Sequence, residues 1–355
     1  RERGNVCLSP LVLQLGLGMA AGGARGETYA QLARVLGLAG SDRRSLLQRH
    51  GELLGQLRDG AGGVELHLAT SLWKRRGTPF RQDFVAACAG YFQAAALETA
   101  FGGGEGQRRI NGWISTQTRG RIPALVARPF DPLTRLVLVS ALHLGGSWEK
   151  PFRKSRTAPA SFYVRPDRPV NHPLMSATER FFHLQDGEKQ ALLLGYRESP
   201  LAMLLLLPRR GGPEALLAGL TPAGLRHTLA ALVPQRGRVE LPRFRIGTGT
   251  RSMSGHLRRL GLTLPFDGDR ADFTLMSAEK TLHIMDVLHQ AAVDVDENGT
   301  TATAAGTVIT GVRNGHSSGS AFHFRADRPF VFLILNRKAG TILFAGVVRN
   351  PAQGQ

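Results

Sequence analysis

Residues 135–144 place the tightest limit on how this chain folds. Their sequence, Arg-Leu-Val-Leu-Val-Ser-Ala-Leu-His-Leu, is too continuously apolar for a strand that has one face in water. A run of this kind is expected where a sheet is covered by other elements on both faces. The chain must therefore contain a buried sheet with packing layers on either side.

The hydrophobic pattern changes from helical to strand-like along the chain. We expect helices at 10–38 with a break at Gly22-Gly23, and at 43–58, 80–98, 107–119, 213–233 and 251–261. We expect the other strands at 64–68, 284–296, 329–336 and 340–348. Helices first and strands later, without regular β-α-β alternation, predict one α+β domain over residues 1–355.

Composition excludes several classes of protein. Of the 355 residues, 42% are hydrophobic and 20% are charged, which excludes a disordered or collagen-like chain. Cys7 and Cys88 are too few for a disulfide scaffold or a multi-thiolate zinc site. No apolar run reaches the ~18 residues of a spanning helix, so we expect no membrane insertion. No start Met or signal-like segment is present, so a targeting signal does not give the compartment.

The net charge of +18 leaves two interpretations open. A basic face could bind an anionic partner. However, only six of the 45 cationic residues are Lys, and a general Arg excess in composition would give the same sum.

Motifs for enzyme chemistry lack their structural context. Gly315-His316-Ser317-Ser318-Gly319 fits G-x-S-x-G, but no His follows Asp327 to complete a triad. The segment 16–21 fits a relaxed dinucleotide fingerprint, but no clear β-α-β unit surrounds it. The eleven His residues include no H-x-x-x-H pair, and no phosphate loop is present. We therefore expect no enzyme activity, no metal and no cofactor.

The segment 298–312 is the most unusual part of the sequence. It contains no charge, no Pro and no aromatic residue, and Arg313 ends it. A flexible linker is one interpretation, although linkers favour Ser, Pro and charge over Val-Ile. Small residues without Pro could instead enter the middle of a sheet. A single Arg after such a run is substrate-like for trypsin-type proteases, whose acidic pocket accepts Arg or Lys.

Short motifs in a fixed order extend the argument over nearly the whole chain. They are 5–10, 23–28, 110–113 with 118–122, 136–142 with Trp148 and Phe152, 241–244, 271–273, 327–330, and 343–346 with Asn350-Pro351. In this order and spacing the chain resembles a serpin, a member of the serine protease inhibitor superfamily. Residues 134–152 and the Arg ending are most similar to the plasminogen activator inhibitor and protease nexin branch.

The resemblance implies a fold and a reactive loop. The expected fold is a single α+β domain with three β-sheets, about eight helices and an exposed reactive-centre loop. The hinge and loop would occupy 297–328, and the family's first helix has no counterpart in the chain. Hinge residues would be Glu297, Gly299, Thr300, Ala302, Ala304 and Ala305. Counting from Glu297 as in inhibitory serpins, the reactive bond falls at Arg313-Asn314.

The resemblance also implies a function. The chain would be a suicide-substrate inhibitor of a trypsin-like serine protease with Arg specificity, trapping the acyl-enzyme by inserting the loop into the main sheet. The alternative is a non-inhibitory serpin that acts as a carrier, a chaperone or a polyanion-binding protein. The branch implies an extracellular, secreted protein that is a monomer.

Supporting residues follow from the same resemblance. Ser9, Ser140 and His289 match the region that opens under the inserting strand, although Ser140 stands where Asn is usual. Trp148, Arg243 and Glu297 are expected together at the top of the main sheet. Heparin or another sulfated polysaccharide would activate inhibition by binding basic residues on and after the helix 43–58, namely Arg43, Arg44, Arg49, Arg58, Lys74, Arg75 and Arg76.

Overall fold

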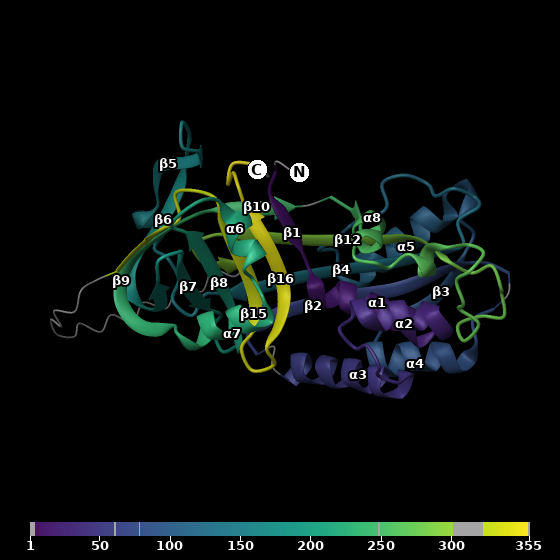
Figure 1. Cartoon of the computed structure of the whole chain (residues 1–355). Coiled ribbons are helices and arrows are strands. Elements are labelled where there is room, and N and C mark those ends of the chain that lie inside the picture. Colours follow the sequence, from purple (N-terminus) through teal and green to yellow (C-terminus); the bar gives the residue numbers. More distant parts are fainter. Residues whose placement is uncertain (1–3, 60–61, 78, 248, 301–321, 354–355) are drawn as a thin grey trace.

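A computed structural model of the chain describes residues 4–59, 62–77, 79–247, 249–300 and 322–353. The body is elongated: strands of two sheets run through it, and most helices gather at one end (Figure 1). The first and last strands lie side by side, since Val6 pairs with Val347. The domain boundaries 1–355 remain a prediction from the sequence.

Eight α-helices are present in the described residues, in agreement with the expected number. They are α1 (Pro10–Gly22), α2 (Gly26–Val35), α3 (Arg43–Asp59), α4 (Gln82–Phe92), α5 (Glu105–Gln117), α6 (Pro213–Ala218), α7 (Pro222–Ala230) and α8 (Ser254–Arg259). The break predicted at Gly22-Gly23 is confirmed. None of the helices in the described parts of the chain is long and apolar enough to span a membrane.

A seven-stranded sheet forms the centre of the molecule. Its order is β10 (Phe244–Gly247), β12 (Ile284–Val295), β13 (Gly299–Thr300), β4 (Leu136–Ser147), β2 (Val64–Arg75) and β3 (Ala95–Thr99), and β11 (Arg251–Ser252) also pairs with β12. This sheet contains the apolar run of the sequence as β4, in its interior.

The second sheet has nine strands. Its order is β1 (Val6–Leu8), β16 (Thr341–Val348), β15 (Phe330–Asn336), β8 (Leu201–Pro208), β7 (Lys189–Gly195), β6 (Arg168–Gln185), β9 (Val233–Pro242) and β14 (Phe322–Arg325), and β5 (Ala158–Arg165) pairs with β6. Where three sheets were expected, the described residues hydrogen-bond as two. The reason is β6, whose 18 residues pair with β5, β9 and β7 in turn and so join two regions.

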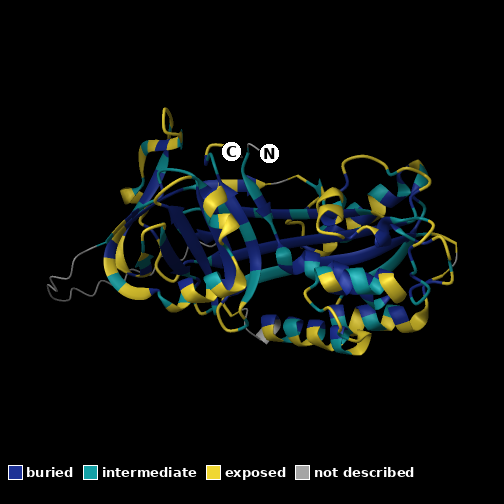
Figure 2. Ribbon diagram, viewed as in Figure 1, coloured by how far each residue is buried: buried dark blue, intermediate teal, exposed yellow. Residues whose placement is uncertain are grey.

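The strand β4 is buried on both faces, as predicted. Eleven of its twelve residues are buried. Leu138 and Leu142 contribute to the large core that also contains α1, whereas Val137 and Val139 pack in a second core with residues of α5. The dark strands at the centre of Figure 2 and the exposed outer sides of α3 and α4 follow the same layering.

The expectation of one helix over 80–98 was wrong. The helix α4 ends at Phe92, because Gln93 adopts a left-handed conformation with φ of 48°. Ala95 to Thr99 then form β3, which pairs in parallel with β2. Ala and Leu are good helix formers, but intrinsic propensity is a small effect, and strand pairing with the central sheet overrides it here.

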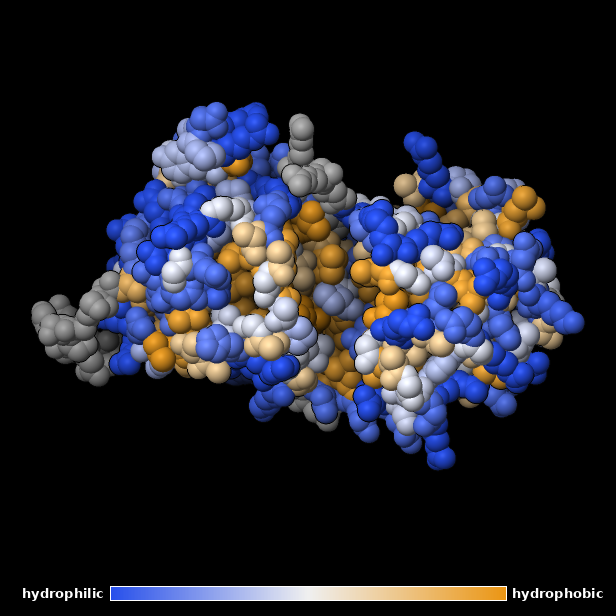
Figure 3. All heavy atoms as spheres, in the orientation of Figure 1, coloured by the Kyte–Doolittle hydropathy of each residue, from blue (hydrophilic) through white to orange (hydrophobic). Residues whose placement is uncertain are grey.

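Apolar side chains reach the surface across the middle of the molecule. In Figure 3 they gather between the half that contains β15 and β16 and the half that contains α1 and α2. Polar residues cover most of both halves outside this band.

Candidate functional site

The strand β13 separates two long strands at one end of the central sheet. Thr300 pairs antiparallel with Val295 of β12 and with Gly146 of β4. Further along, β12 and β4 pair directly and in parallel, over 284–291 and 136–142. At one end, the two residues of β13 therefore lie between β12 and β4. Along the rest of their length, β12 and β4 pair directly with each other.

A tight turn leads the chain from β12 into β13. The Asp296 carboxylate accepts hydrogen bonds from the backbone N–H groups of Asn298 (2.7 Å) and Gly299 (3.1 Å). This pattern is an Asx turn, which Asp followed by Asn-Gly favours. A Cβ atom at Gly299 would lie 1.9 Å from the carbonyl oxygen of Gly146. Only glycine lets β13 approach β4 so closely.

Glu297 forms a charged network in this turn. Its side chain is 2% exposed, and its carboxylate accepts hydrogen bonds from Arg243 Nε (2.9 Å) and Nη2 (2.5 Å) and from Thr157 Oγ1 (2.5 Å). Burial tends to raise the pKa of Glu297, but the hydrogen bonds from Arg243 and Thr157 outweigh it and hold that pKa below its ordinary value. The predicted proximity of Glu297 and Arg243 is confirmed.

Trp148 connects the turn to the second sheet. Its backbone N–H donates to the carbonyl oxygen of Asn298 (2.8 Å), and its indole N–H donates to that of Asp296 (3.0 Å). The indole stacks on Tyr196 with ring centroids 4.9 Å apart. The hydroxyl groups of Tyr196 and Thr300 are 2.6 Å apart, and complete burial raises the pKa of Tyr196. Tyr196 therefore remains a neutral partner for the first residues of the loop.

A second polar cluster lies where β12 and β4 are in direct contact. His289 pairs with Ser140 in the parallel register, and Ser140 Oγ is 3.2 Å from His289 Nδ1. The backbone N–H of Ser9, which caps α1, donates to His289 Nε2 over 3.0 Å. Because Nε2 must accept, the proton of the neutral ring is on Nδ1 and donates to Ser140. The three residues expected together are in contact.

Burial controls the charge of this cluster. It lowers the pKa of His289 to about 4, because the ring is 2% exposed and desolvation disfavours the imidazolium. A second proton on Nε2 would also meet the Ser9 N–H, which is itself a donor. His289 is thus neutral at physiological pH.

Several predicted residues lie outside the described residues. These are the hinge residues Ala302, Ala304 and Ala305, the reactive bond Arg313-Asn314, and the G-x-S-x-G motif at 315–319. Their roles stay predictions from the sequence.

The basic residues do not gather into one patch. Lys74 is fully buried and 3.6 Å from Glu98, so its place in a polyanion site was wrong; strand β2, rather than a surface loop, contains it. Arg76 is exposed but pairs with Glu105 at 2.7 Å. Arg43, Arg44 and Arg49 are exposed on α3, and Arg58 is near its end. At 100° per residue, Arg44 and Arg49 point about 140° apart, and the exposed Glu52 lies between their directions.

Sequence reasoning missed three members of the site. Asp296, Thr157 and Tyr196 all bond to the turn or to β13. The Asx-turn pattern of Asp296 to Gly299 could have revealed the first. Thr157 and Tyr196 have no such local pattern, because strand pairing between distant segments brings them here. The described residues contain no group of three or more His, Cys, Asp or Glu side chains arranged to hold a metal.

Comparison with known proteins gives a consistent answer. The family profile described as "Serpin (serine protease inhibitor)" matches residues 1–351. An uncharacterized serpin-like protein of Thermococcus kodakarensis is 33% identical, over 99% of this chain and 82% of its own length.

Solved structures agree on the fold. The native thermophilic serpin tengpin has a TM-score of 0.89 and 25% identity, over 99% of this chain and 89% of that one. Human thyroxine-binding globulin, in complex with thyroxine, has a TM-score of 0.89 and 23% identity, over 99% and 93%. With β13 between β12 and β4, and the family profile covering nearly every residue, the chain belongs to the serpin family.

Proposed function

We propose that this serpin is a suicide-substrate inhibitor of trypsin-like serine proteases, cleaved after Arg313. The protease serine would attack the Arg313 carbonyl carbon, release the amine of Asn314 and form an acyl-enzyme. The freed loop would then extend β13 down the central sheet and carry the attached protease with it before deacylation.

The register of β13 is the observation that carries this proposal. Thr300 is already paired with both neighbours, and each added residue moves the antiparallel register one residue back on each of them. Position 304 would come opposite Ala291 and Leu142, and position 306 opposite His289 and Ser140. Ala291 and Leu142 already pair with each other across β12 and β4, and so do His289 and Ser140. The loop can therefore enter the junction without a slip in register as far as position 309, opposite Asp286 and Val137, where an irregularity in β12 begins.

The sequence of the loop fits that register. Side chains at 302, 304 and 306 would share the face of Thr300, which contacts Tyr196, and would meet the core that contains Leu142 and Leu144. Ala302, Ala304 and Gly306 are small enough for that crowded face. Gly306 would bring no side chain to the point where Ser140 and His289 must separate.

Strand formation offers the driving force. The segment 301–313 could add about a dozen ladder hydrogen bonds at ~1 kcal/mol each. Opposing this, the direct β12–β4 pairs over 284–291 must open. Each opened strand pairs again with the new strand between them, so the pairing lost is replaced on both sides.

We also propose a branch of the serpin family for this chain. Residues 134–152 and the Arg ending support the plasminogen activator inhibitor and protease nexin branch, and with it a secreted, extracellular monomer. A monomer peak in size-exclusion chromatography and secretion of the full-length gene product from cultured cells would test these points.

A non-inhibitory serpin is the alternative. Thyroxine-binding globulin has the same fold and is bound to thyroxine in its structure, so the fold alone does not decide. The absence of bulky or charged residues from 299–306 favours insertion instead. In the alternative, cleavage in the loop would occur without trapping of the protease.

A gel experiment separates the two functions. The chain is mixed with trypsin, thrombin and urokinase-type and tissue-type plasminogen activators, and the products are run on a denaturing gel. Inhibition predicts a covalent adduct that survives SDS, with Asn314 as the new N-terminus of the released fragment. Arg313→Ala should abolish the adduct, whereas Arg337→Ala, in an exposed turn, should keep it. Cleavage without any adduct would select the alternative.

A sulfated polysaccharide remains part of the proposal as an activator. The exposed Arg43, Arg44 and Arg49 support it, but without Lys74. Neutralising these three should lower heparin affinity much more than neutralising Arg209, Arg210 and Arg236, which are also exposed. The affinity should fall linearly with salt on logarithmic axes, because binding releases counterions. Equal losses from the two triple variants would mean that only net charge attracts heparin.

A further inference from the structure

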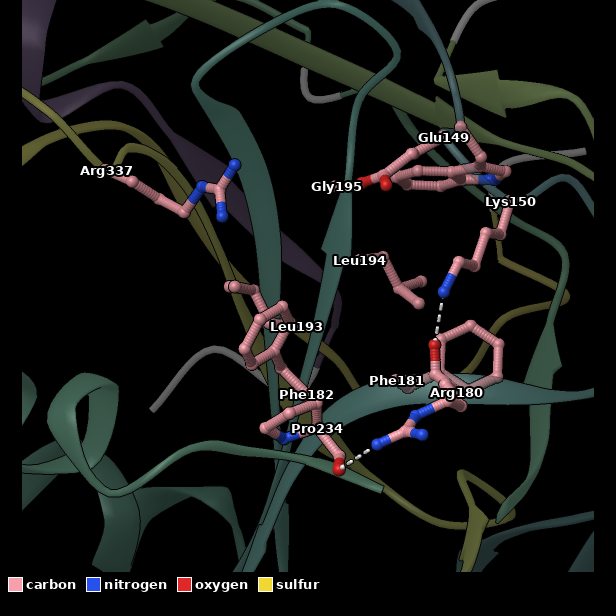
Figure 4. Close-up of a pocket in the computed structure, with 11 residues that line it drawn as sticks. Glu149, Lys150, Arg180, Phe181, Phe182, Leu193, Leu194, Gly195, Pro234 and Arg337 are labelled. Carbon is pink, nitrogen blue, oxygen red and sulfur yellow. Dashed lines mark hydrogen bonds between the residues drawn. The ribbon is translucent and has the colours of Figure 1, made fainter. Parts of the chain in front are cut away.

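A cavity of about 230 Å³ lies beside Trp148. Residues 148–150, which follow β4, the strands β6, β7 and β9 and the turn after β15 surround it (Figure 4). Its lining includes four buried apolar side chains, those of Trp148, Phe181, Leu193 and Leu194. Phe182, 44% exposed, adds an aromatic wall. An apolar group would leave water on entering this cavity.

Two cations at its rim lack an acidic partner. Lys150 Nζ donates to the carbonyl oxygen of Arg180 over 2.6 Å, and Arg180 Nη2 donates to that of Pro234 over 3.5 Å, as Figure 4 shows. Among the described residues, no carboxylate forms an ion pair with either side chain. Backbone oxygens thus hold both groups at the cavity without neutralising them.

These cations keep donors for a ligand. An ammonium group has three N–H donors and a guanidinium five, so each has unused donors after its bond to the backbone. Glu149 is the only carboxylate in the lining, and its Oε2 lies over Gly195, 2.6 Å from the position of an added Cβ atom. With Arg337 also in the lining, positive charge exceeds negative at this cavity.

We propose that this cavity binds a small amphipathic anion, with an apolar body on Trp148 and Phe181 and a carboxylate at Lys150 and Arg180. Charge-assisted hydrogen bonds to a carboxylate are stronger than neutral ones, and the apolar body adds burial. Aromatic carboxylates and short fatty acids share this chemistry, and the probes below distinguish them.

Occupancy would also affect the loop, and this consequence rests on the proposed function. Trp148 lines the cavity and holds Asp296 and Asn298 with its two N–H groups. A ligand packed on the indole favours the arrangement in which these bonds exist. Because that arrangement holds β13 in the register from which the loop inserts, occupancy should favour loop insertion over deacylation.

Calorimetry on the full chain tests the site. The probes are naphthalene-2-carboxylate and octanoate, each compared with its neutral counterpart, naphthalene-2-carboxamide or octan-1-ol. We expect one carboxylate of the pair to bind at least tenfold more tightly than its neutral form. The double variant Lys150→Met with Arg180→Met should lose about tenfold for that carboxylate and little for the neutral probe.

The matched control is Arg209→Met with Arg210→Met, which removes two exposed charges away from the cavity. It should leave binding unchanged. Equal losses in both double variants, or equal affinity for charged and neutral probes, would overturn the proposal.

If the variant with Lys150→Met does not fold, acetic anhydride labelling of the unaltered chain tests the site instead. The bound carboxylate should protect Lys150 from acetylation and leave the exposed Lys154 reactive. Equal labelling with and without probe would refute the site.

The effect on the loop is measured separately, as moles of inhibitor consumed per protease inhibited. Saturating carboxylate should lower that ratio with the rate of loop cleavage kept. A probe that binds without changing the ratio would refute the coupling and leave the site. A chain that forms no adduct even without probe would refute the proposed function, and calorimetry would still decide the site.

Discussion

The two ends of the β12–β4 junction differ in how they are held. At the β13 end the strands are already apart, and a charged network of Glu297, Arg243 and Thr157 fixes the turn. At His289 the strands are in contact, and neutral hydrogen bonds to Ser140 and Ser9 connect them to α1. One end uses charge that persists at all physiological pH values, whereas the other depends on a single neutral imidazole.

In the proposed loop insertion, this difference separates the start, at β13, from the continuation past His289. The β13 end fixes where a strand enters and in which register, because Gly299 and Thr300 are already in place. The His289 end resists opening, because its hydrogen bonds must break before position 306 can enter. Perturbing the first region should therefore change the outcome of the reaction, and perturbing the second should change how readily the sheet opens.

The largest effect is expected from Ala302→Arg, between the two regions. Position 302 would face the same buried side as Thr300, and an unpaired buried charge costs several kcal/mol. The variant should be cleaved at a normal rate but form no SDS-stable adduct. Ala302→Ser, small and neutral, is the control and should still form the adduct. Undiminished adduct with Ala302→Arg would argue against insertion.

Gly299→Ala should break the β13 end. The added Cβ would lie 1.9 Å from the Gly146 oxygen, so β13 must leave its place and lose the bond from Thr300 to Tyr196. Overpacking of this kind costs about 3 kcal/mol, measured as a lower urea midpoint. Gly247→Ala is the control, since its Cβ would meet no atom within 4 Å. Equal midpoints would mean that β13 adds nothing to native stability.

Lowering the pH should weaken the His289 end. The pKa of His289 is about 4 in the fold against about 6.5 unfolded, so the unfolded chain binds more protons between these values. The contribution of His289 to stability is therefore present above pH 6.5 and falls with pH, by about 2 kcal/mol at pH 5.

His289→Gln should remove that part of the pH dependence. His143 is the control residue, because burial lowers its pKa to about 4 as well. It lies on β4 and stacks on His67, so it is not part of the contact between His289 and Ser140. The protection factors for hydrogen exchange at Leu288 and Ser140, which correct for the slower intrinsic exchange at low pH, should fall below pH 6 in the unaltered chain and in His143→Gln, but not in His289→Gln. Protection factors that fall on acidification in all three proteins would assign the effect to another group.

The smallest effect is expected at the Glu297–Arg243 pair. Arg243 is 40% exposed, so solvent screens part of the attraction and the coupling should be about 1 kcal/mol. A double-mutant cycle with Glu297→Gln and Arg243→Gln measures it. The coupling should vary little between pH 6 and 8, because the pKa of Glu297 is below its ordinary value. A coupling energy that falls to zero in this range would contradict the claim that the Glu297–Arg243 pair stays charged at physiological pH.

The sequence predicts the parts of this site that have their own patterns. Burial of β4 on both faces follows from its unbroken apolar run, and the contact of Ser9, Ser140 and His289 follows from the family resemblance. Residues without a local pattern could not be found. Tyr196 meets Thr300 only because the two sheets pack against each other, and their separation in sequence is 104 residues.

The end of α4 and the burial of Lys74 were also missed because contacts between distant segments determine them. The end of α4 depends on one left-handed residue, Gln93, and on the pairing of β3 with β2, which helix propensity does not include. The family resemblance places Lys74 in a polyanion site because it follows the helix 43–58, but in the fold Lys74 is buried, with Glu98 at 3.6 Å and the Phe80 ring 5.4 Å from its ammonium group.

The double register of Thr300 has a consequence for how such chains vary over generations. In the proposed insertion, each residue after Thr300 would pair one position further back on both β12 and β4. Adding or deleting one residue between 300 and 306 would then turn every later side chain to the opposite face of the sheet. Length should thus be invariant before the reactive bond, and only residue identity free to drift. The segment after Arg313 would not have to keep this pairing register, so insertions and deletions of residues should accumulate there.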